Sequence, residues 1–181
     1  MKRIFGLLAI LTIVLTSCEG DPGPQGPPGQ DGVNIVGTTF EINSTFEYNN
    51  DSNLWSTGFI TFSDFTDVEV LESDAVLIYR LDGEGTLNDG SSVDEWSMLP
   101  QNFFTNEGTL QYVFNHTFVD AEIFIDGNYD TSNISTGFTD DQVFRIVIVP
   151  SDFASQFTGD INNLSEVMNA LGQSESDVIR M

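Results

Sequence analysis

The sequence predicts a mostly β protein: an antiparallel β-sandwich with one short helix near its C-terminus. A β-barrel is the alternative. Beyond Gly32 the composition becomes rich in Phe, Val, Ile and Thr, which favour strands. Short runs of these residues alternate with turn signals such as Asn88-Asp89-Gly90, and no helical pattern separates them through the body of the domain. Short strands at this spacing are typical of sandwiches.

Residues 1–17 have the parts of a lipoprotein signal peptide. Lys2 and Arg3 form a positive n-region, and the apolar stretch 4–15 is too short for a transmembrane helix, which needs about 20 residues. The small residues Thr and Ser stand directly before Cys18, the only cysteine of the chain. We therefore expect cleavage before Cys18 and lipid attachment at its thiol. An ordinary secretory signal or an uncleaved anchor is the alternative.

Lipid chains on Cys18 predict where the mature chain is held. One myristoyl-length chain binds a bilayer only marginally, and stable anchoring takes two or more signals. The two or three acyl chains of bacterial lipoproteins meet that requirement. We expect a lipid-anchored protein of the cell envelope, at the outer membrane or the cell surface.

Residues 18–34 comprise the lipidated cysteine and a collagen-like tether. Glycine occupies every third position from Gly20 to Gly32, and prolines stand between the glycines. The crowded axis of a collagen triple helix requires this period, and proline favours the polyproline II conformation. The tract is short and has no trimerising segment beside it. We therefore expect an extended single-chain tether. A homotrimeric stalk is the alternative, because anchoring in one plane concentrates the strands.

The folded domain is expected over residues 35–181. Strands are predicted at residues 34–42, 54–62, 68–71, 75–81, 93–99, 109–118, 119–125 and 142–149, and turns at Asp82-Gly83-Glu84-Gly85 and at Asn88-Asp89-Gly90.

Two stretches predict how strands sit in the sandwich. Even positions are apolar from Leu110 to Phe118, and odd positions are apolar from Val119 to Ile125. Because a one-residue shift exchanges the faces of a strand, we expect a bulge, a corner or a change of sheet near Phe118. The stretch 142–149 is apolar on both faces except for Arg145, which predicts a central strand ended by Pro150.

One helix is predicted near the C-terminus. Its apolar residues stand at helical spacing: Leu164, Val167, Met168 and Leu171. Asn162 or Asn163 can cap its start and Gly172 can close it. Residues 173–181 are either a loose tail or, through Val178 and Ile179, a last strand.

The charge excludes some partners. The chain has 5 Lys and Arg against 28 Asp and Glu, a formal net charge of −23, and loss of Lys2 and Arg3 with the leader makes it −25. The remaining cations are Arg80, Arg145 and Arg180. Phosphate backbones and anionic lipid head groups are bound by clustered Lys and Arg, so we expect no nucleic-acid partner and no direct head-group binding.

Candidates for catalysis are few. His116 stands between Phe114 and Phe118 on an apolar strand face, so we expect it to be buried and hydrogen-bonded. One histidine, no lysine and no free cysteine in the mature chain leave few routes to an activated nucleophile or a zinc site. Carboxylate pairs such as Asp94 with Glu95, or Asp64 with Asp67, could cleave a glycoside. Among 28 acids such pairs carry little specificity, and we assign no catalytic residue.

Calcium is the one cofactor that the sequence suggests. Asp126, Asn128 and Asp130 place side-chain oxygens at alternate positions, as at the start of an Asp-x-Asn-x-Asp calcium loop. The pattern is incomplete, because Thr131 replaces the expected glycine and Gly137 stands where a glutamate would close the loop. A solvated hairpin loop is the alternative. A second acidic cluster contains Asp82, Glu84, Asn88, Asp89, Asp94 and Glu95.

The whole chain resembles the small collagen-like lipoproteins of Bacteroidetes. In these, Thr-Ser-Cys-Glu-Gly-Asp, here residues 16–21, and a brief Gly-X-Y run precede an acidic, aromatic-rich domain. The resemblance extends through residues 72–80, 96–101 and 108–118. It implies an outer-membrane or cell-surface lipoprotein and transfers no catalytic residue.

Two classes of function remain. The first is a non-enzymatic β domain presented at the membrane surface for contact with a protein, a neighbouring chain or a glycan. The second is a carboxylate-dependent glycoside hydrolase of the surface, or a calcium-dependent glycan-binding module. Trp55 or Trp96 could stack on sugar rings if exposed, although tryptophans in a sandwich of this size are more often part of the core.

Overall fold

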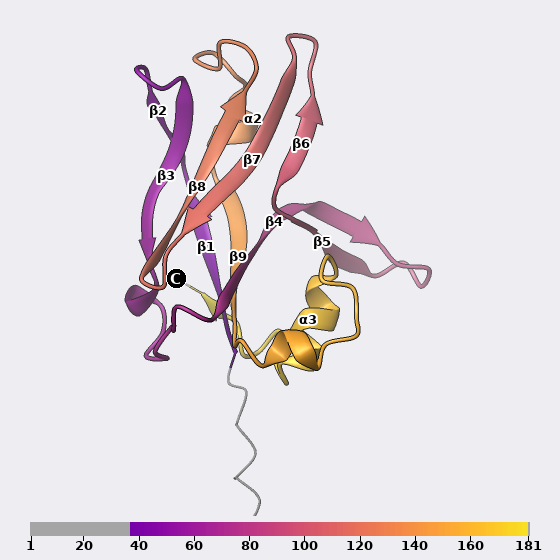
Figure 1. Cartoon of the computed structure of the whole chain (residues 1–181). Helices are drawn as coiled ribbons and strands as arrows, with labels where there is room; N and C mark the ends of the chain where they lie inside the picture. The colour runs from indigo at the N-terminus through magenta and orange to yellow at the C-terminus, as the bar shows by residue number, and fades with distance from the viewer. Residues whose placement is uncertain (1–36, 181) are drawn as a thin grey trace, which may run out of the picture. The chain divides into compact units, whose positions relative to one another are not determined.

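Two five-stranded sheets form the domain in the computed structural model, which describes residues 37–180 (Figure 1). Sheet A has the order β10-β1-β9-β4-β5, and sheet B has the order β2-β3-β8-β7-β6. Neighbouring strands are antiparallel except for β1 and β10. The predicted antiparallel sandwich is confirmed, and neither sheet closes into a barrel.

The elements have the following bounds. The strands are β1 Thr38–Ser44, β2 Glu47–Asn49, β3 Leu54–Thr61, β4 Ala75–Thr86, β5 Ser92–Met98, β6 Gln101–Phe104, β7 Thr109–His116, β8 Asp120–Gly127, β9 Gln142–Val149 and β10 Ile179–Arg180. The helices are α2 Thr136–Thr139 and α3 Leu164–Ala170, with short 3₁₀ turns η1 Phe62–Asp64 and η2 Phe153–Ser155.

The main core lies between the two sheets. Alternate residues of the strands face it, as period-2 patterning requires. Sheet A contributes chiefly Phe40, Ile42, Val76, Ile78, Phe144, Ile146 and Ile148, and sheet B contributes Leu110, Tyr112, Ala121, Ile123 and Ile125. Burial raises the pKa of Tyr112 to about 12, and its hydroxyl donates to the Phe138 carbonyl at 2.6 Å.

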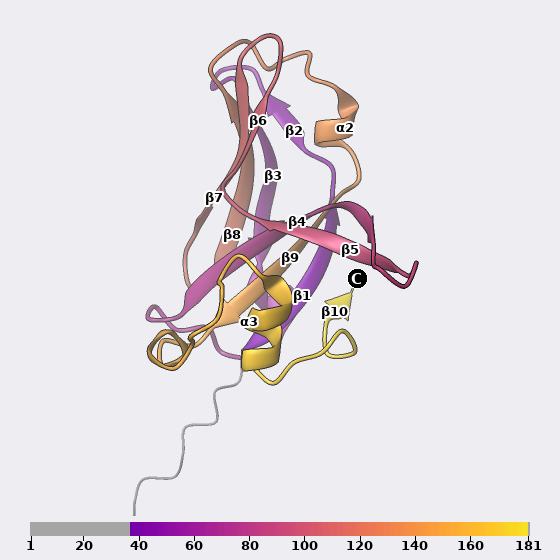
Figure 2. The ribbon, with the colours of Figure 1, turned by 90° about the vertical axis from the view of Figure 1, so that its right-hand side faces the viewer.

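A second core covers the outer face of sheet A. The residues of β4 and β9 that point away from sheet B pack against α3, η2 and the C-terminal segment. Figure 2 shows α3 lying over that face and β10 beside β1. Strand β9 is therefore buried on both sides, as its apolar run predicts, and it lies between β1 and β4 at the centre of sheet A.

Helix α3 agrees with its sequence signals. Leu164, Val167 and Met168 are buried on the sheet side, and the Asn163 side chain accepts a hydrogen bond from the Glu166 amide. Gly172 has a φ of +70°, a left-handed conformation that glycine adopts without strain at a helix end.

Several local predictions are wrong. Residues 68–71 form no strand. The predicted turn at Asp82–Gly85 is instead part of β4, which continues through a bulge between Leu81 and Gly83. The chain reverses at Leu87–Ser91. Strands β2 and β6 and helix α2 were not predicted, whereas β10 confirms the last-strand alternative.

The change of apolar phase near Phe118 has a simpler cause than a bulge or a change of sheet. Thr117 to Asp120 make a hairpin turn, with the Thr117 amide donating to the Asp120 carbonyl at 2.9 Å. Strands β7 and β8 pair Tyr112 with Ile125. Even positions of one strand therefore share a face with odd positions of the next.

The signal peptide, Cys18 and the Gly-X-Y tract all lie outside the described residues. Within residues 37–180, no helix is both long enough and apolar enough to span a lipid bilayer.

Candidate functional site

Three connections gather at the end of the sandwich opposite the start of β1 (Figure 1). They join β2 to β3, β6 to β7, and β8 to α2. A cleft with a volume of about 540 Å³ lies between the last two, from Phe104–Glu107 on one side to Tyr129–Phe138 on the other. We call it the loop-end cleft.

Phe104 is the most exposed large apolar side chain of the described residues. It is the last residue of β6 and is 89% exposed. Its neighbour Phe103 points the other way, into contact with Tyr112 and Phe138 at ring distances of 5.7 and 5.4 Å. Strand alternation therefore turns Phe104 towards solvent, where its ring forgoes the roughly 1.5–3 kcal/mol that burial provides.

The polar lining consists of amides and carboxylates. Asn106 and Glu107 are exposed, and their side chains make no hydrogen bond to the rest of residues 37–180. Across the cleft, Asp130 and Asn133 are also exposed. Hydrogen bonds from the side chain and the backbone amide of Ser132 lower the pKa of Asp130, so this group is a carboxylate at neutral pH.

Asn53 and Thr131 hold the loops beside the cleft in place. The Thr131 amide donates to Asn53 Oδ1 at 2.8 Å, and Thr131 Oγ1 donates to the Asn53 carbonyl at 2.9 Å. Asn53 Nδ2 in turn donates to the Tyr129 carbonyl at 2.8 Å. Thr131 is fully buried, and its carbonyl accepts from the Trp55 indole at 2.9 Å. The connection after β8 is thus fixed to the connection before β3.

The predicted calcium residues are engaged in separate local contacts. Asp126 accepts from the Gly127 amide at 2.7 Å, and Asn128 Oδ1 accepts from the Thr109 amide at 2.9 Å. Only Asp130 lines the cleft. Within the described part of the chain, no group of three or more His, Cys, Asp or Glu is placed to hold a metal ion. Calcium binding stays a prediction.

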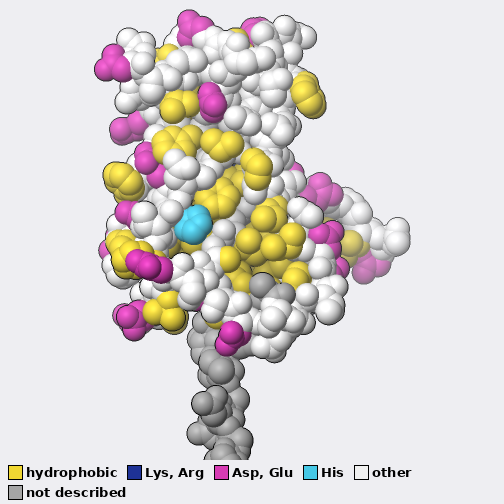
Figure 3. Space-filling model, viewed as in Figure 1, with side chains coloured by type: hydrophobic (Ala, Val, Ile, Leu, Met, Phe, Trp, Pro, Cys, Tyr) yellow, Lys and Arg dark blue, Asp and Glu magenta, His cyan; other side chains and the backbone are white. Residues whose placement is uncertain are grey.

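His116 is exposed, so its predicted burial is wrong. Strand β6 pairs with β7 only as far as Tyr112, and the end of β7 is therefore left at an open edge. The His116 ring stacks on Phe114 at 6.1 Å, and Figure 3 shows the imidazole at the surface.

The candidate acid pairs are not brought together. Asp94 and Glu95 are neighbours on β5, so their side chains point to opposite faces. Asp64 ends η1, and Asp67 lies in the following loop; both are exposed.

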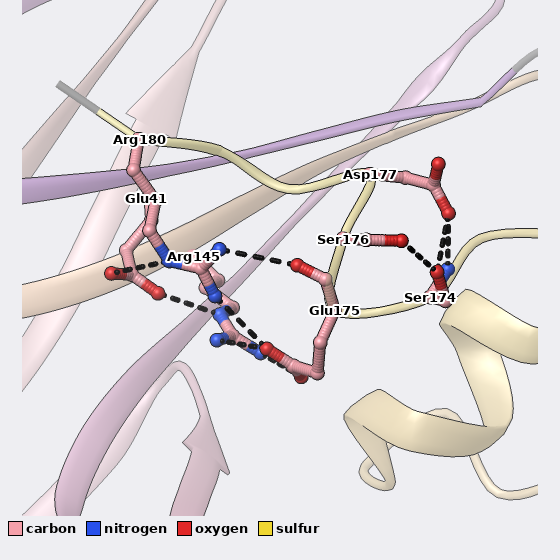
Figure 4. Close-up of polar contacts among 7 residues, drawn as sticks. All are labelled: Glu41, Arg145, Ser174, Glu175, Ser176, Asp177 and Arg180. Atoms are coloured by element: carbon pink, nitrogen blue, oxygen red, sulfur yellow. Dashed lines mark hydrogen bonds and ion pairs between the residues drawn. The ribbon is translucent and has the colours of Figure 1, made fainter.

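A second polar centre lies on the outer face of sheet A. Arg145 is 1% exposed; its Nε donates to Glu41 at 2.9 Å and its two terminal nitrogens donate to Glu175 at 2.6 and 2.7 Å (Figure 4). The half-buried Trp96 ring lies 4.1 Å from the guanidinium. Arg180 also pairs with Glu41 and Glu175. This network joins the C-terminal segment to β1.

The third arginine is also paired. Arg80 contacts Asp82 at 2.7 Å and lies over the Tyr112 ring at 4.9 Å. The arginines of residues 37–180 are thus all in ion pairs within the domain. The face in Figure 3 shows acidic side chains and no visible Lys or Arg.

The cleft was not predicted. The turn signal Asn106-Glu107-Gly108 was visible in the sequence, and Phe104 stands directly before it. Tyr129 and Asp130 lie across the cleft from it because β6, β7 and β8 pair in that order, and no local pattern in the sequence reveals this pairing.

These features define a β-sandwich module with a cleft at its loop end. Comparisons with protein-family models, with curated proteins and with solved structures found no match.

Proposed function

We propose that this chain is a lipid-anchored protein of the cell envelope whose β domain binds a partner without catalysing a reaction. The leader and Cys18 supply the attachment, and the Gly-X-Y tract separates the anchor from the domain. The observation that carries the binding role is the loop-end cleft with its exposed Phe104.

The position of the cleft suits a tethered binder. Strand β1 begins at Thr38, six residues beyond Gly32, and the connections that line the cleft lie at the opposite end of the sandwich (Figure 1). A partner that enters the cleft therefore does not meet the start of β1.

The carboxylates of the cleft favour binding over hydrolysis. A glycosidase needs a carboxylic acid with a raised pKa as its proton donor. Asp130 has the opposite shift, since hydrogen bonds from Ser132 lower its pKa. Glu107 is exposed to solvent. Asp130 therefore suits hydrogen-bond acceptance more than proton donation.

The attachment is tested with Cys18→Ser in cells that are fed a fatty-acid analogue. We expect the wild type to take up the label and to remain in the membrane fraction, and Cys18→Ser to lose both. Ser17→Ala is the matched control, because it keeps a small residue before the cysteine and should behave as the wild type. Normal processing and membrane retention of Cys18→Ser would refute the proposal.

A further inference from the structure

The loop-end cleft combines an exposed ring with planar polar groups. Phe104 presents an apolar face in water, and the apolar C–H faces of sugar rings pack on such rings. The lining of the same cleft also includes Asn106 and Asn133, which offer amide donors and acceptors, and Glu107 and Asp130, which offer acceptors. Adjacent hydroxyl groups of a sugar can pair with both atoms of such planar side chains.

The charge of the lining narrows the ligand class. Glu107 and Asp130 are its charged groups, and both are acidic. The arginines of the described domain are already paired with Asp82, Glu41 and Glu175. Phosphorylated, sulfated and uronic-acid ligands would therefore meet repulsion without a compensating cation.

Hydrogen bonds within the domain order one wall of the cleft. The hydrogen bonds between Asn53, Thr131 and Tyr129 fix one wall, and the Asn128 side chain joins that wall to the start of β7. Gly108 is needed at this junction, because a Cβ there would collide with Asn128 Oδ1. A wall that is ordered before binding reduces the entropy lost on association.

We infer that the loop-end cleft binds an uncharged oligosaccharide, with Phe104 as the platform for one sugar ring and Asn106, Asn133, Glu107 and Asp130 as hydrogen-bonding partners. This inference rests on the proposed binding function and names its ligand class.

The test uses the full mature Cys18→Ser chain, which lacks lipid, with calorimetric titration of a panel of neutral hexasaccharides built from glucose, mannose, xylose or N-acetylglucosamine. We expect at least one of them to bind, and Phe104→Ala to weaken that binding about tenfold or more. Phe59→Ala is the matched control: Phe59 is 76% exposed on β3 and lies outside the cleft, so its loss should change affinity less than about twofold. Equal thermal melts of both variants show that the fold is intact.

The panel also includes an oligogalacturonate and a lysine-rich peptide. If no neutral sugar binds, or if Phe104→Ala and Phe59→Ala bind equally well, the glycan inference is wrong. Binding of the peptide alone through Phe104 also overturns it, yet leaves the proposed binding role standing. The membrane attachment is tested separately, by the fractionation of cells that produce Cys18→Ser.

Discussion

Arg145 determines how the outer face of sheet A is organised. Burial lowers its pKa, but hydrogen bonds to Glu175 and Glu41 outweigh that effect, so the net shift is upward. The sequence singles out Arg145 as the one charge in an apolar strand. Its partners stand 104 and 30 residues away along the chain, so only the folded structure reveals them.

Breaking this centre should cost much more than breaking its exposed neighbour. We expect Arg145→Gln to lower the free energy of unfolding by about 1.5–3 kcal/mol, because it removes the charged hydrogen bonds of a buried guanidinium and leaves the more exposed Glu41 and Glu175 without that partner. Arg180→Gln is the control, because the Arg180 side chain is 47% exposed, and it should cost at most about 1 kcal/mol. Urea denaturation measures both free energies of unfolding. The dependence of each free energy on urea concentration should be the same as in the wild type. Equal costs would contradict the role given to Arg145.

Thr131 shows why the calcium pattern is incomplete. At the position where a calcium loop needs glycine, this chain has a buried threonine whose hydroxyl and amide bind Asn53. The motif predicts side-chain oxygens of Asn128 and Asp130 as calcium ligands, and in the structure the Asn128 oxygen accepts a hydrogen bond from the start of β7.

The calcium hypothesis has a direct test. If calcium binds at Asp126, Asn128 and Asp130, millimolar calcium raises the melting temperature by mass action, and Asp130→Asn removes that increase. Magnesium and sodium at equal ionic strength are the controls. Equal melting temperatures with calcium and with chelator would show that the domain binds no calcium, and the proposed binding role would then need no metal.

At the scale of elements, the C-terminal segment depends on its ion pairs with β1. The hydrogen bond from Arg145 is the largest cause of the lowered pKa of Glu175, and Arg180 adds to it. A carboxylate whose pKa is depressed by folding adds stability above its unfolded pKa, and that stability is lost as the pH falls through the folded value.

The segment should therefore loosen in acid. We expect residues 173–180 to detach from β1 at a pH below 4.5, the ordinary pKa of Glu175, before the core unfolds. Trp96 fluorescence reports this step, because its ring lies against Arg145. Glu175→Gln should remove the step, and Glu72→Gln, an exposed residue without an ion pair in the described domain, should keep it. The same acid transition in both variants would disprove this assignment.

The elements also show which patterns carry information. Strand β9 and helix α3 were predicted at nearly their observed positions, because a continuous apolar run and a capped helical period are local signals. The predicted strand at residues 75–81 ends too early, because the bulge that follows Leu81 uses the same small and polar residues as a turn. Strand β6 has only four residues and gave no clear period.

At the scale of the whole molecule, the sandwich was predictable but its pairing was not. The alternation of apolar and polar residues along each strand indicates which side chains face a core, and this pattern predicted the correct fold class. The pairing of β1 with β9 joins Phe40 to Ile146, residues far apart in the chain. The loop-end cleft depends on the same long-range pairing, so no candidate site could be placed there from the sequence.

Within the described residues, both hydrophobic cores are extensive and include residues from Phe40 to Ile179, so we expect the domain to fold without the tract. We expect a fragment of residues 34–181 to unfold in one cooperative transition, at a midpoint close to that of the mature chain. Sedimentation of both proteins reports the oligomeric state. Unfolding of the fragment, or a midpoint of the mature chain that depends on its concentration, would show that the tract assembles trimers on which stability depends.

We propose that the β domain is attached to a membrane through lipid chains on Cys18. Intact mass spectrometry of the mature protein from the membrane fraction tests it most directly. We predict the mass of residues 18–181 increased by a diacylglyceryl group, with or without a third acyl chain on the amine. The unmodified mass of residues 18–181, or that of the whole chain with its leader, would show that Cys18 does not carry the lipid anchor.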